Sequence, residues 1–172
     1  MRIALTGTPG TGKTSVSGIL SSRGHSILNL TEFIKQNDLR EEYEEERDTY
    51  EVDTDRLNEA LKDREDIIFE SHLAHFLDVD LIIVLRCKPD VLAQRLRDRG
   101  YGPCKVRENM EAELLDVILC ESVDSGTPTF VADTTSCTPE ETADAVEDIM
   151  KGDTDGHMPG DITWVEEMDK WF

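Results

Sequence analysis

A glycine-rich segment near the start of the chain has residue types and a spacing that suit phosphate binding. Gly7–Thr14 reads GTPGTGKT and fits the pattern G-x-x-x-x-G-K-[ST]. Its glycines let the backbone turn tightly, so that several N–H groups point at one anion. Lys13 can then reach the outer phosphates of a nucleoside triphosphate, and the Thr14 hydroxyl can hold Mg²⁺. A chance glycine-rich turn is the alternative. The apolar run Ile3–Leu5 before the segment and a helix-compatible stretch after it favour a nucleotide-binding loop.

An acidic residue at the end of a second apolar run is the candidate for a magnesium anchor. Glu70 directly follows Ile67–Phe69. Ligands of parallel sheets bind beyond the carboxyl ends of the strands, so we expect Glu70 to hold Mg²⁺ through water. A strand-end carboxylate at the surface is the alternative. His72 and His75 are three residues apart, but two histidines without further ligands are weak evidence for a metal site. We expect His72 to contact a substrate phosphate or to orient a carboxylate, and His75 to pack.

A cluster of basic residues suits the binding of a transferred phosphate. Arg95 and Arg99 are four residues apart and therefore share one helix face. Lys105 and Arg107 follow in what we expect to be a short loop after Gly100–Pro103. Together they predict a mobile lid that brings cations onto the phosphates and excludes water. Basic residues that only complement a helix dipole are the alternative. So much positive charge in one place in a strongly acidic chain favours the lid.

The composition predicts one acidic domain. The chain has 172 residues, 18 of them basic and 38 acidic, which gives a formal net charge of −20. We interpret this charge as adaptation to a very salty cytoplasm, where counter-ions screen self-repulsion, although an ordinary acidic protein is the alternative. The charge disfavours non-specific nucleic-acid binding and favours a basic partner. The cysteines lack C-x-x-C spacing, so we expect free thiols in the cytoplasm and no zinc site. No signal peptide or membrane span is evident.

Alternating apolar strands and amphipathic helices must position these residues. We expect one solvated loop or frayed helix at 38–50. Helices are expected at 15–22, at 31–37 with Thr31 as its cap, after Asp53 and Asp55 with Leu57, Ala60 and Leu61 on one face, from Pro89 to Arg99, at 108–123, and at 139–150 with a capping box at Thr138. The expected strands are Ile3–Leu5, His25–Leu30, Ile67–Phe69, Leu81–Leu85 and Thr129–Val131. This order predicts an α/β fold with a five-stranded parallel sheet and helices on both faces.

Four segments together resemble the adenylate kinase isoenzyme six family, also called CINAP-like proteins, in its archaeal form. They are Leu5–Thr14, Phe69–His72, Arg95–Tyr101 and Asp161–Glu166. The phosphate loop is common to many kinases, whereas the R-L-x-x-R-G-Y segment and the tail are more specific. The acidic composition suggests a haloarchaeal member of this family.

The resemblance implies a fold like that of nucleoside monophosphate kinases and the reaction ATP + AMP ⇌ 2 ADP, with Mg²⁺ and a side ATPase activity. It implies a kinase domain at 1–151, with a monophosphate-binding segment at 29–52 and a lid at 98–108, followed by a linker and tail at 152–172. It also implies a role in maturation of the small ribosomal subunit through a basic ribosomal protein.

The resemblance also assigns site residues. Lys35 and His72 are expected beside the AMP acceptor, and the ATP contacts are expected to be Gly10, Gly12, Lys13, Thr14, Ser15 and Arg99. Glu70 stands where eukaryotic members have aspartate, and Lys35 stands where they have arginine, which weakens the expected grip on the acceptor. The acidic stretch 41–46 would face the acceptor site, and only salt adaptation or the docking of a basic partner accounts for it.

Three functions remain open on the sequence. The first is a nucleoside monophosphate kinase, and the second is an ATP-driven assembly factor that binds a ribosomal protein, with incidental kinase activity. The third is a kinase for another small acceptor.

Overall fold

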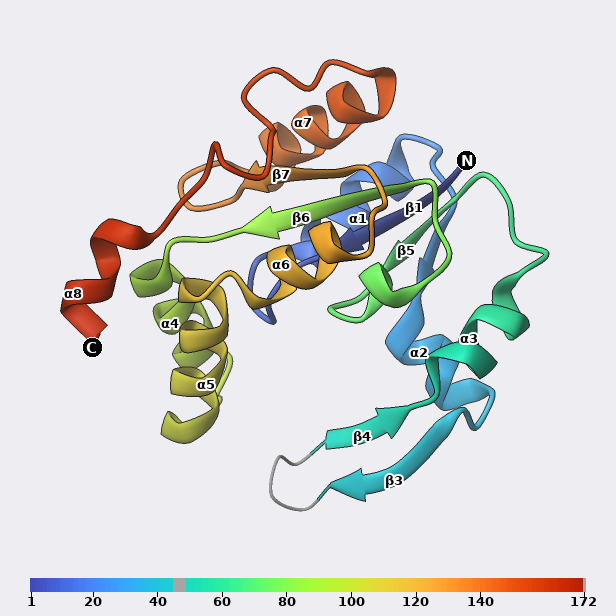
Figure 1. The fold of residues 1–172 in the computed structure, drawn as a ribbon, viewed down its shortest axis with the longest axis horizontal. Helices are drawn as coiled ribbons and strands as arrows, with labels where there is room; N and C mark the ends of the chain where they lie inside the picture. The colour runs from blue at the N-terminus through green and yellow to red at the C-terminus, as the bar shows by residue number, and fades with distance from the viewer. Residues whose placement is uncertain (45–48, 172) are drawn as a thin grey trace.

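The five predicted strands form one parallel sheet in a computed structural model that describes residues 1–44 and 49–171 (Figure 1). The strand order is β2-β5-β1-β6-β7. The bounds are β1 Arg2–Thr6, β2 Ile27–Asn29, β5 Ile67–Glu70, β6 Leu81–Arg86 and β7 Thr129–Asp133. The predicted fold class is confirmed. Since β1 lies between β5 and β6, the ends of these three strands meet at one edge of the sheet.

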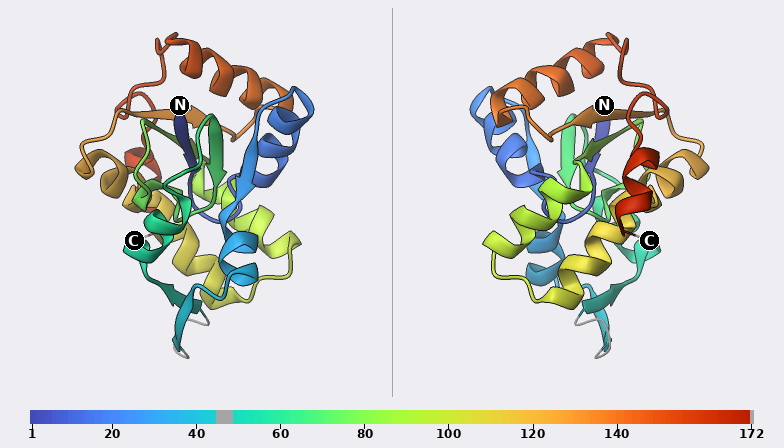
Figure 2. Two further views of the ribbon diagram at one scale, coloured as in Figure 1. Left: turned by 90° about the vertical axis from the view of Figure 1, so that its right-hand side faces the viewer. Right: turned by 90° about the vertical axis from the view of Figure 1, so that its left-hand side faces the viewer.

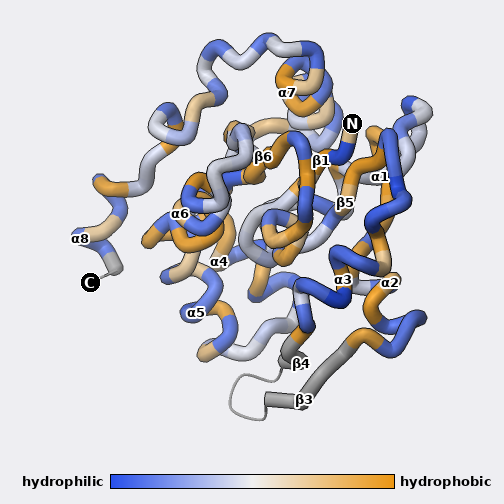
Figure 3. The backbone as a smooth tube through the Cα atoms, turned by 45° about the vertical axis from the view of Figure 1, so that its right-hand side comes forward, coloured by the Kyte–Doolittle hydropathy of each residue, from blue (hydrophilic) through white to orange (hydrophobic). Residues whose placement is uncertain are grey.

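Both faces of the sheet are covered, because side chains along each strand alternate between two cores. Ala4 of β1 packs with helices α2 (Leu30–Gln36) and α3 (Thr54–Leu61), the short η1 (Ala74–Phe76) and α6 (Val117–Asp124). Ile3 and Leu5 pack on the other face with α1 (Lys13–Ser22) and α7 (Pro139–Lys151). Figure 2 shows α1 and α6 on opposite sides of the sheet. In Figure 3 hydrophobic residues gather along the central strands, whereas α3 is largely hydrophilic.

A third apolar cluster joins helices α4 (Pro89–Asp98) and α5 (Pro103–Leu114) to the end of the chain. Each of these helices begins with proline at its first position, where the missing N–H costs no hydrogen bond. Trp164 and Met168 pack against the cluster from the tail, which contains η2 (Val165–Glu167) and α8 (Met168–Trp171). The tail therefore lies against the same pair of helices that carries the predicted lid cations.

The structure corrects two predicted helix bounds. Asn29, and not Thr31, caps α2, because the strand β2 ends there and the Asn29 side chain accepts a hydrogen bond from the Glu32 N–H at 2.9 Å. The helix predicted at 108–123 is two helices, α5 and α6. Asp116 separates them with a left-handed backbone at φ 56° and forms an ion pair with Arg86 of β6. At Thr138 the predicted capping box is present.

The acidic segment predicted as a loop or frayed helix is a hairpin instead. Strands β3 (Arg40–Glu44) and β4 (Thr49–Val52) pair antiparallel, with Tyr43 opposite Tyr50, and extend away from the main sheet (Figure 1). Thr49, Tyr50 and Val52 are residue types that strands favour, and the high acidic content of the segment obscured this signal. Part of the acidic stretch 41–46, residues 45 and 46, lies outside the described residues.

The predicted lid loop is shorter than expected. Only residues 99–102 connect α4 to α5, and Lys105 and Arg107 lie in the first turns of α5. Pro103 starts the helix early because its fixed φ suits the first helical position. All four cysteines are free thiols, and Cys87 is buried. Within the part of the chain that the structure describes, none of the helices has the length and apolar character needed to cross a bilayer.

Candidate active site

The phosphate loop connects the end of β1 to the start of α1, and two of its glycines are required by close packing. Gly7 has φ 140°, and a Cβ there would lie 2.5 Å from the Leu85 carbonyl oxygen of β6. Gly10 has φ 95°, and a Cβ there would lie 2.9 Å from the Leu92 side chain of α4. A side chain at either position would meet both backbone strain and a steric clash. The loop is therefore pressed against β6 and α4.

Lys13 is folded back on the loop and is 8% exposed. Its Nζ donates to the Gly7 carbonyl oxygen at 2.6 Å and to the Thr8 carbonyl oxygen at 3.1 Å. Burial lowers the pKa of Lys13 from 10.5 to about 8, and Arg99 adds to that effect, while the carboxylates of Glu70 and Glu113 oppose it. The phosphates of a nucleotide would add further negative charge beside this buried amine and favour its protonated form.

Glu70 and Thr14 converge beside the loop. The parallel register places Glu70 next to both Leu5 of β1 and Asn29 of β2. One Glu70 oxygen accepts from Asn29 Nδ2, and the other lies 3.5 Å from Thr14 Oγ1. A carboxylate and a hydroxyl are oxygen ligands of the kind that Mg²⁺ prefers. Glu70 is only 5% exposed and Thr14 is exposed, so these two oxygen donors fit a magnesium ion that is bound beside the loop and open to solvent on one side.

Two cavities meet at the phosphate loop. The smaller one has a volume of about 230 Å³, and its lining includes Gly10, Gly12, Ser15, Arg95, Arg99 and Thr134. The larger one has a volume of about 660 Å³, and its lining includes Gly10, Gly12, Lys13, Thr14, Thr31, His72, Arg99, Lys105, Val117 and Ile118. Arg99 lines both cavities. The loop therefore has room for one ligand on each side, with the Arg99 side chain beside both of them.

The two arginines that were predicted as one clamp both line the smaller cavity, and Arg99 lines the larger cavity as well. Arg95 donates to the Thr134 carbonyl oxygen at 2.6 Å and to Thr134 Oγ1 at 3.2 Å, so it lines the smaller cavity beside the segment after β7. Arg99 is the exposed C-cap of α4 and borders the larger cavity as well. Lys105 lines the larger cavity, whereas Arg107 pairs with Glu111 at 2.6 Å and lines a different cavity, between α4 and α5.

The two histidines after β5 have different surroundings. His72 is exposed where it opens onto the larger cavity, and crowding by surrounding protein atoms, together with the charges of Lys13 and His75, lowers its pKa to about 4. His75 is buried, with Nδ1 at 3.1 Å from Thr6 Oγ1 and Nε2 at 3.0 Å from Glu121 Oε2. Burial lowers the pKa of His75 as well, against the effect of Glu121. Both ring nitrogens of His75 thus have protein partners, which agrees with a packing role.

Lys35, predicted beside the acceptor, is exposed in the last turn of α2. Thr31 of the same helix lines the larger cavity, and Lys35 is not among the described residues that do so. The arrangement therefore brings together Gly10, Gly12, Lys13, Thr14, Ser15, Glu70, His72, Arg95 and Arg99, and it leaves Lys35 at the periphery.

Sequence reasoning missed Glu113, a buried carboxylate of α5. It pairs with Arg86 at 2.8 Å and accepts from Thr8 Oγ1 at 2.6 Å. A signal was present, because Val106, Met110 and Leu114 mark the core face of α5, and Glu113 lies on that face. A charged residue at a core position is almost always paired, so the position of Glu113 predicts a buried ionic partner.

Comparisons with known proteins show the family to which the chain belongs. The family model described as an AAA domain matches residues 3–116. A protein of Natronomonas pharaonis named "Putative adenylate kinase" is 43% identical over 155 residues, which cover 89% of this chain and 92% of that protein. A protein of Methanocaldococcus jannaschii with the same name is 40% identical over 172 residues, which cover 97% and 94%.

Solved structures share the fold at low identity. A deoxyadenosine kinase from M. mycoides, with the products dCMP and dCDP bound, has a TM-score of 0.59 and 18% identity, and the match covers 88% of this chain and 100% of that one. Shikimate kinase from Acinetobacter baumannii, in complex with shikimate, has a TM-score of 0.62 and 15% identity, with 88% and 93% covered. These two show the fold alone. From the family model and the archaeal relatives, the chain belongs to the AAA-domain family of phosphate-loop proteins and, within it, to the family of archaeal proteins that bear the name "Putative adenylate kinase".

Proposed function

We propose that this protein is a nucleoside monophosphate kinase that transfers the γ-phosphate of ATP to AMP and yields two ADP. The observation that carries the proposal is the pair of cavities on either side of one phosphate loop, with Arg99 lining both. A kinase with two nucleotide substrates needs this arrangement, whereas an ATPase needs room only for ATP and water. The names of the archaeal relatives support the same activity.

In this proposal ATP lies over the phosphate loop with its nucleoside in the smaller cavity, near Arg95 and Thr134. Backbone N–H groups of Gly10, Gly12 and the start of α1 bind the phosphates, with Ser15 at the entrance of that cavity. Lys13 leaves its contacts with the loop carbonyls and neutralises the outer phosphates. In this step the phosphates add negative charge beside an amine whose pKa is lowered to about 8 by burial.

The acceptor AMP lies in the larger cavity, with its phosphate toward His72 and its base against Val117 and Ile118. An oxygen of the AMP phosphate attacks the γ-phosphorus, and the bond from that phosphorus to the bridging oxygen of ADP breaks. Arg99, between the cavities, stabilises the negative charge on the transferred group. Thr14 and, through water, Glu70 would hold Mg²⁺, which neutralises phosphate charge when bound. His72, with its lowered pKa, serves as a neutral hydrogen-bond partner.

A coupled assay of ADP formation tests the proposal. In high salt, ATP and Mg²⁺ should yield ADP in an AMP-dependent reaction, and a panel of other monophosphates and shikimate should react more slowly. Lys13→Ala should abolish activity. Arg99→Ala should lower kcat more than it weakens ATP binding, while Arg97→Ala, an exposed arginine of the same helix that lines neither cavity, is the matched control.

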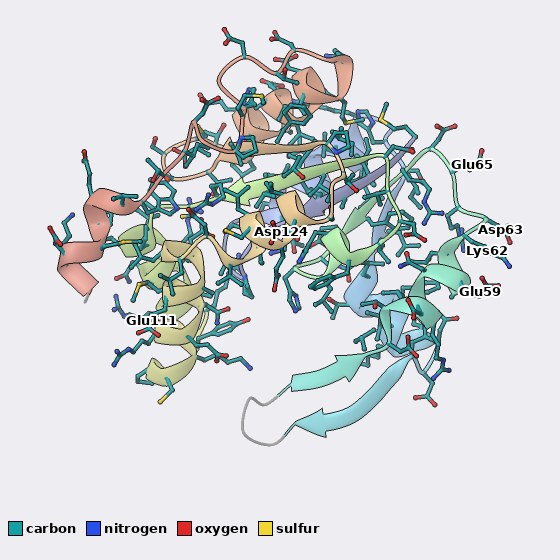
Figure 4. All side chains as sticks on the ribbon, viewed as in Figure 1. Glu59, Lys62, Asp63, Glu65, Glu111 and Asp124 are labelled. Atoms are coloured by element: carbon teal, nitrogen blue, oxygen red, sulfur yellow. The ribbon has the colours of Figure 1, made fainter. Side chains whose placement is uncertain are left out.

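The net charge of −20 favours a second function, that of an ATP-driven assembly factor for a basic ribosomal protein of the small subunit. Figure 4 shows Glu59, Asp63, Glu65, Glu111 and Asp124 at the surface, on several different elements. This charge also supports a salty cytoplasm as the working environment. ATP hydrolysis without AMP-dependent ADP formation, together with capture of a ribosomal protein at native salt, would favour this function over the kinase.

A further inference from the structure

The two oxygens of the Glu113 carboxylate have different partners. Oε1 accepts three hydrogen bonds from the framework, from Arg86 Nε at 2.8 Å, the Cys87 N–H at 3.1 Å and Trp164 Nε1 at 3.1 Å. Oε2 accepts from Thr8 Oγ1 at 2.6 Å. The residue is 3% exposed, so bulk water does not compete for these bonds. One oxygen thus ties the carboxylate to the end of β6 and to the tail, and the other binds the phosphate loop.

Thr8 passes this constraint on to Lys13. The Thr8 carbonyl oxygen accepts from Lys13 Nζ at 3.1 Å, from the Thr11 N–H at 3.2 Å and from Thr11 Oγ1 at 2.9 Å. Because the Thr8 hydroxyl is held by Glu113, rotation of the residue is restricted at both its side chain and its backbone. The resting position of the lysine therefore depends on a carboxylate 105 residues away from Thr8 in the sequence.

The carboxylate is itself held rigidly. Arg86 is 1% exposed and forms ion pairs with Glu113 and with Asp116, the residue that separates α5 from α6. The Trp164 ring lies with its centroid 5.6 Å from the Arg86 guanidinium carbon. A hydrogen bond to a charged group in a dry site is worth more than a neutral one. Because Arg86 and Glu113 are buried and paired with each other, this network can hold the phosphate loop in one position, which an exposed ion pair could not do.

We propose that Glu113 is a positioning residue for phosphoryl transfer, acting through the Thr8 hydroxyl on the phosphate loop. Trp164 donates to the same carboxylate, so the tail is part of the support for the active site. The inference rests on the proposed kinase function, but the position of the loop affects ATP hydrolysis in the same way as transfer to AMP.

Thr8→Val and Thr8→Ser form the matched pair that tests the inference. Valine keeps the shape of the side chain but loses the hydroxyl donor, whereas serine keeps the donor, and neither variant breaks the Arg86–Glu113 pair. We expect Thr8→Val to lower kcat about tenfold, which corresponds to about 1.4 kcal/mol of transition-state stabilisation. The Kd of MgATP should change less than about threefold. Thr8→Ser should keep kcat within about twofold of the unchanged protein.

A purely structural role would lower the midpoint of thermal unfolding of Thr8→Val and leave kcat of the folded enzyme unchanged, which would overturn the inference. Equal losses in the serine and valine variants would overturn it too. If Thr8→Val does not fold, Glu113→Gln decides by the same kcat criterion, since it keeps the shape and an acceptor for Arg86.

The design separates this inference from the proposed function. If the unchanged protein hydrolyses ATP but does not phosphorylate AMP, the kinase proposal fails, and the hydrolysis rates of the serine and valine variants still decide the role of Glu113. If the unchanged protein has neither activity, both proposals are overturned.

Discussion

The lowered pKa of Lys13 predicts that this one residue makes the ligand-free protein more stable as the pH rises. In the unfolded chain the amine has its ordinary pKa of 10.5, and in the folded protein burial lowers that pKa to about 8. Between these values the unfolded chain binds a proton that the folded protein has released. The free energy of unfolding therefore increases with pH across this window, and the cost of the buried charge is fully present below it.

The size of the effect follows from the two pKa values. From about pH 7 to about pH 9.5, the titration of Lys13 alone should raise the free energy of unfolding by about 2 kcal/mol. The side chain is 8% exposed, so solvent screening reduces this figure little. Lys13→Met removes the titration and keeps a chain of similar length. The variant should lack this share of the pH dependence, whatever its absolute stability.

Urea denaturation of both proteins at the two pH values and in the same salt measures the effect. Other groups that titrate in this range are common to both proteins, so their contributions cancel in the difference. Saturating MgATP should also remove the difference, because phosphates beside Lys13 restore its charge. Equal pH dependence of the two ligand-free proteins would refute the reasoning, and it would mean that the amine is hydrated in solution.

The other predictions concern the two cavities and the tail. Arg95→Ala should weaken MgATP binding about tenfold in calorimetry, because it removes a charged side chain that lines the smaller cavity. Arg97→Ala should leave MgATP binding unchanged. Equal effects of the two substitutions would contradict the assignment of ATP to that cavity. Trp164→Phe loses the indole N–H donor and part of a ring that packs against the α4–α5 cluster, so it should lower the free energy of unfolding by about 1–3 kcal/mol in urea. Val165→Ala, at a residue that is 63% exposed, is the control. Glu70→Gln should raise the Mg²⁺ concentration needed for half-maximal turnover, and an unchanged requirement would remove Glu70 from the metal site.

Local patterns in the sequence were sufficient for much of the fold. The five strands, the proline starts of α4 and α7 and the capping box at Thr138 depend on residues within a few positions of one another. The same holds for the phosphate loop, whose glycines and lysine are adjacent. One predicted helix was wrong because a contact with a distant residue interrupts it. Residues 108–123 are compatible with one helix, and the break at Asp116 accompanies its ion pair with the distant Arg86.

The site was predictable only in part for the same reason. Glu70 could be placed beside the loop because the ends of parallel strands meet at one edge of a sheet. Arg95 and Arg99 share a helix face, but that spacing does not reveal that one contacts Thr134 and the other borders both cavities. Lys35 was assigned by resemblance, and the direction of α2 leaves it exposed.

By itself, the sequence determined that the chain has a nucleotide-binding loop in an α/β sheet, because a tight turn, its glycines and its lysine are consecutive residues. Only the tertiary structure decided which distant groups reach that loop. Thr8 and Glu113 are 105 residues apart, and Trp164 joins them from the tail. Their contact depends on β1 and β6 being neighbours and on α5 packing over the end of β6. Helical spacing marks Glu113 as a core position, but it does not identify the distant residues that Glu113 contacts.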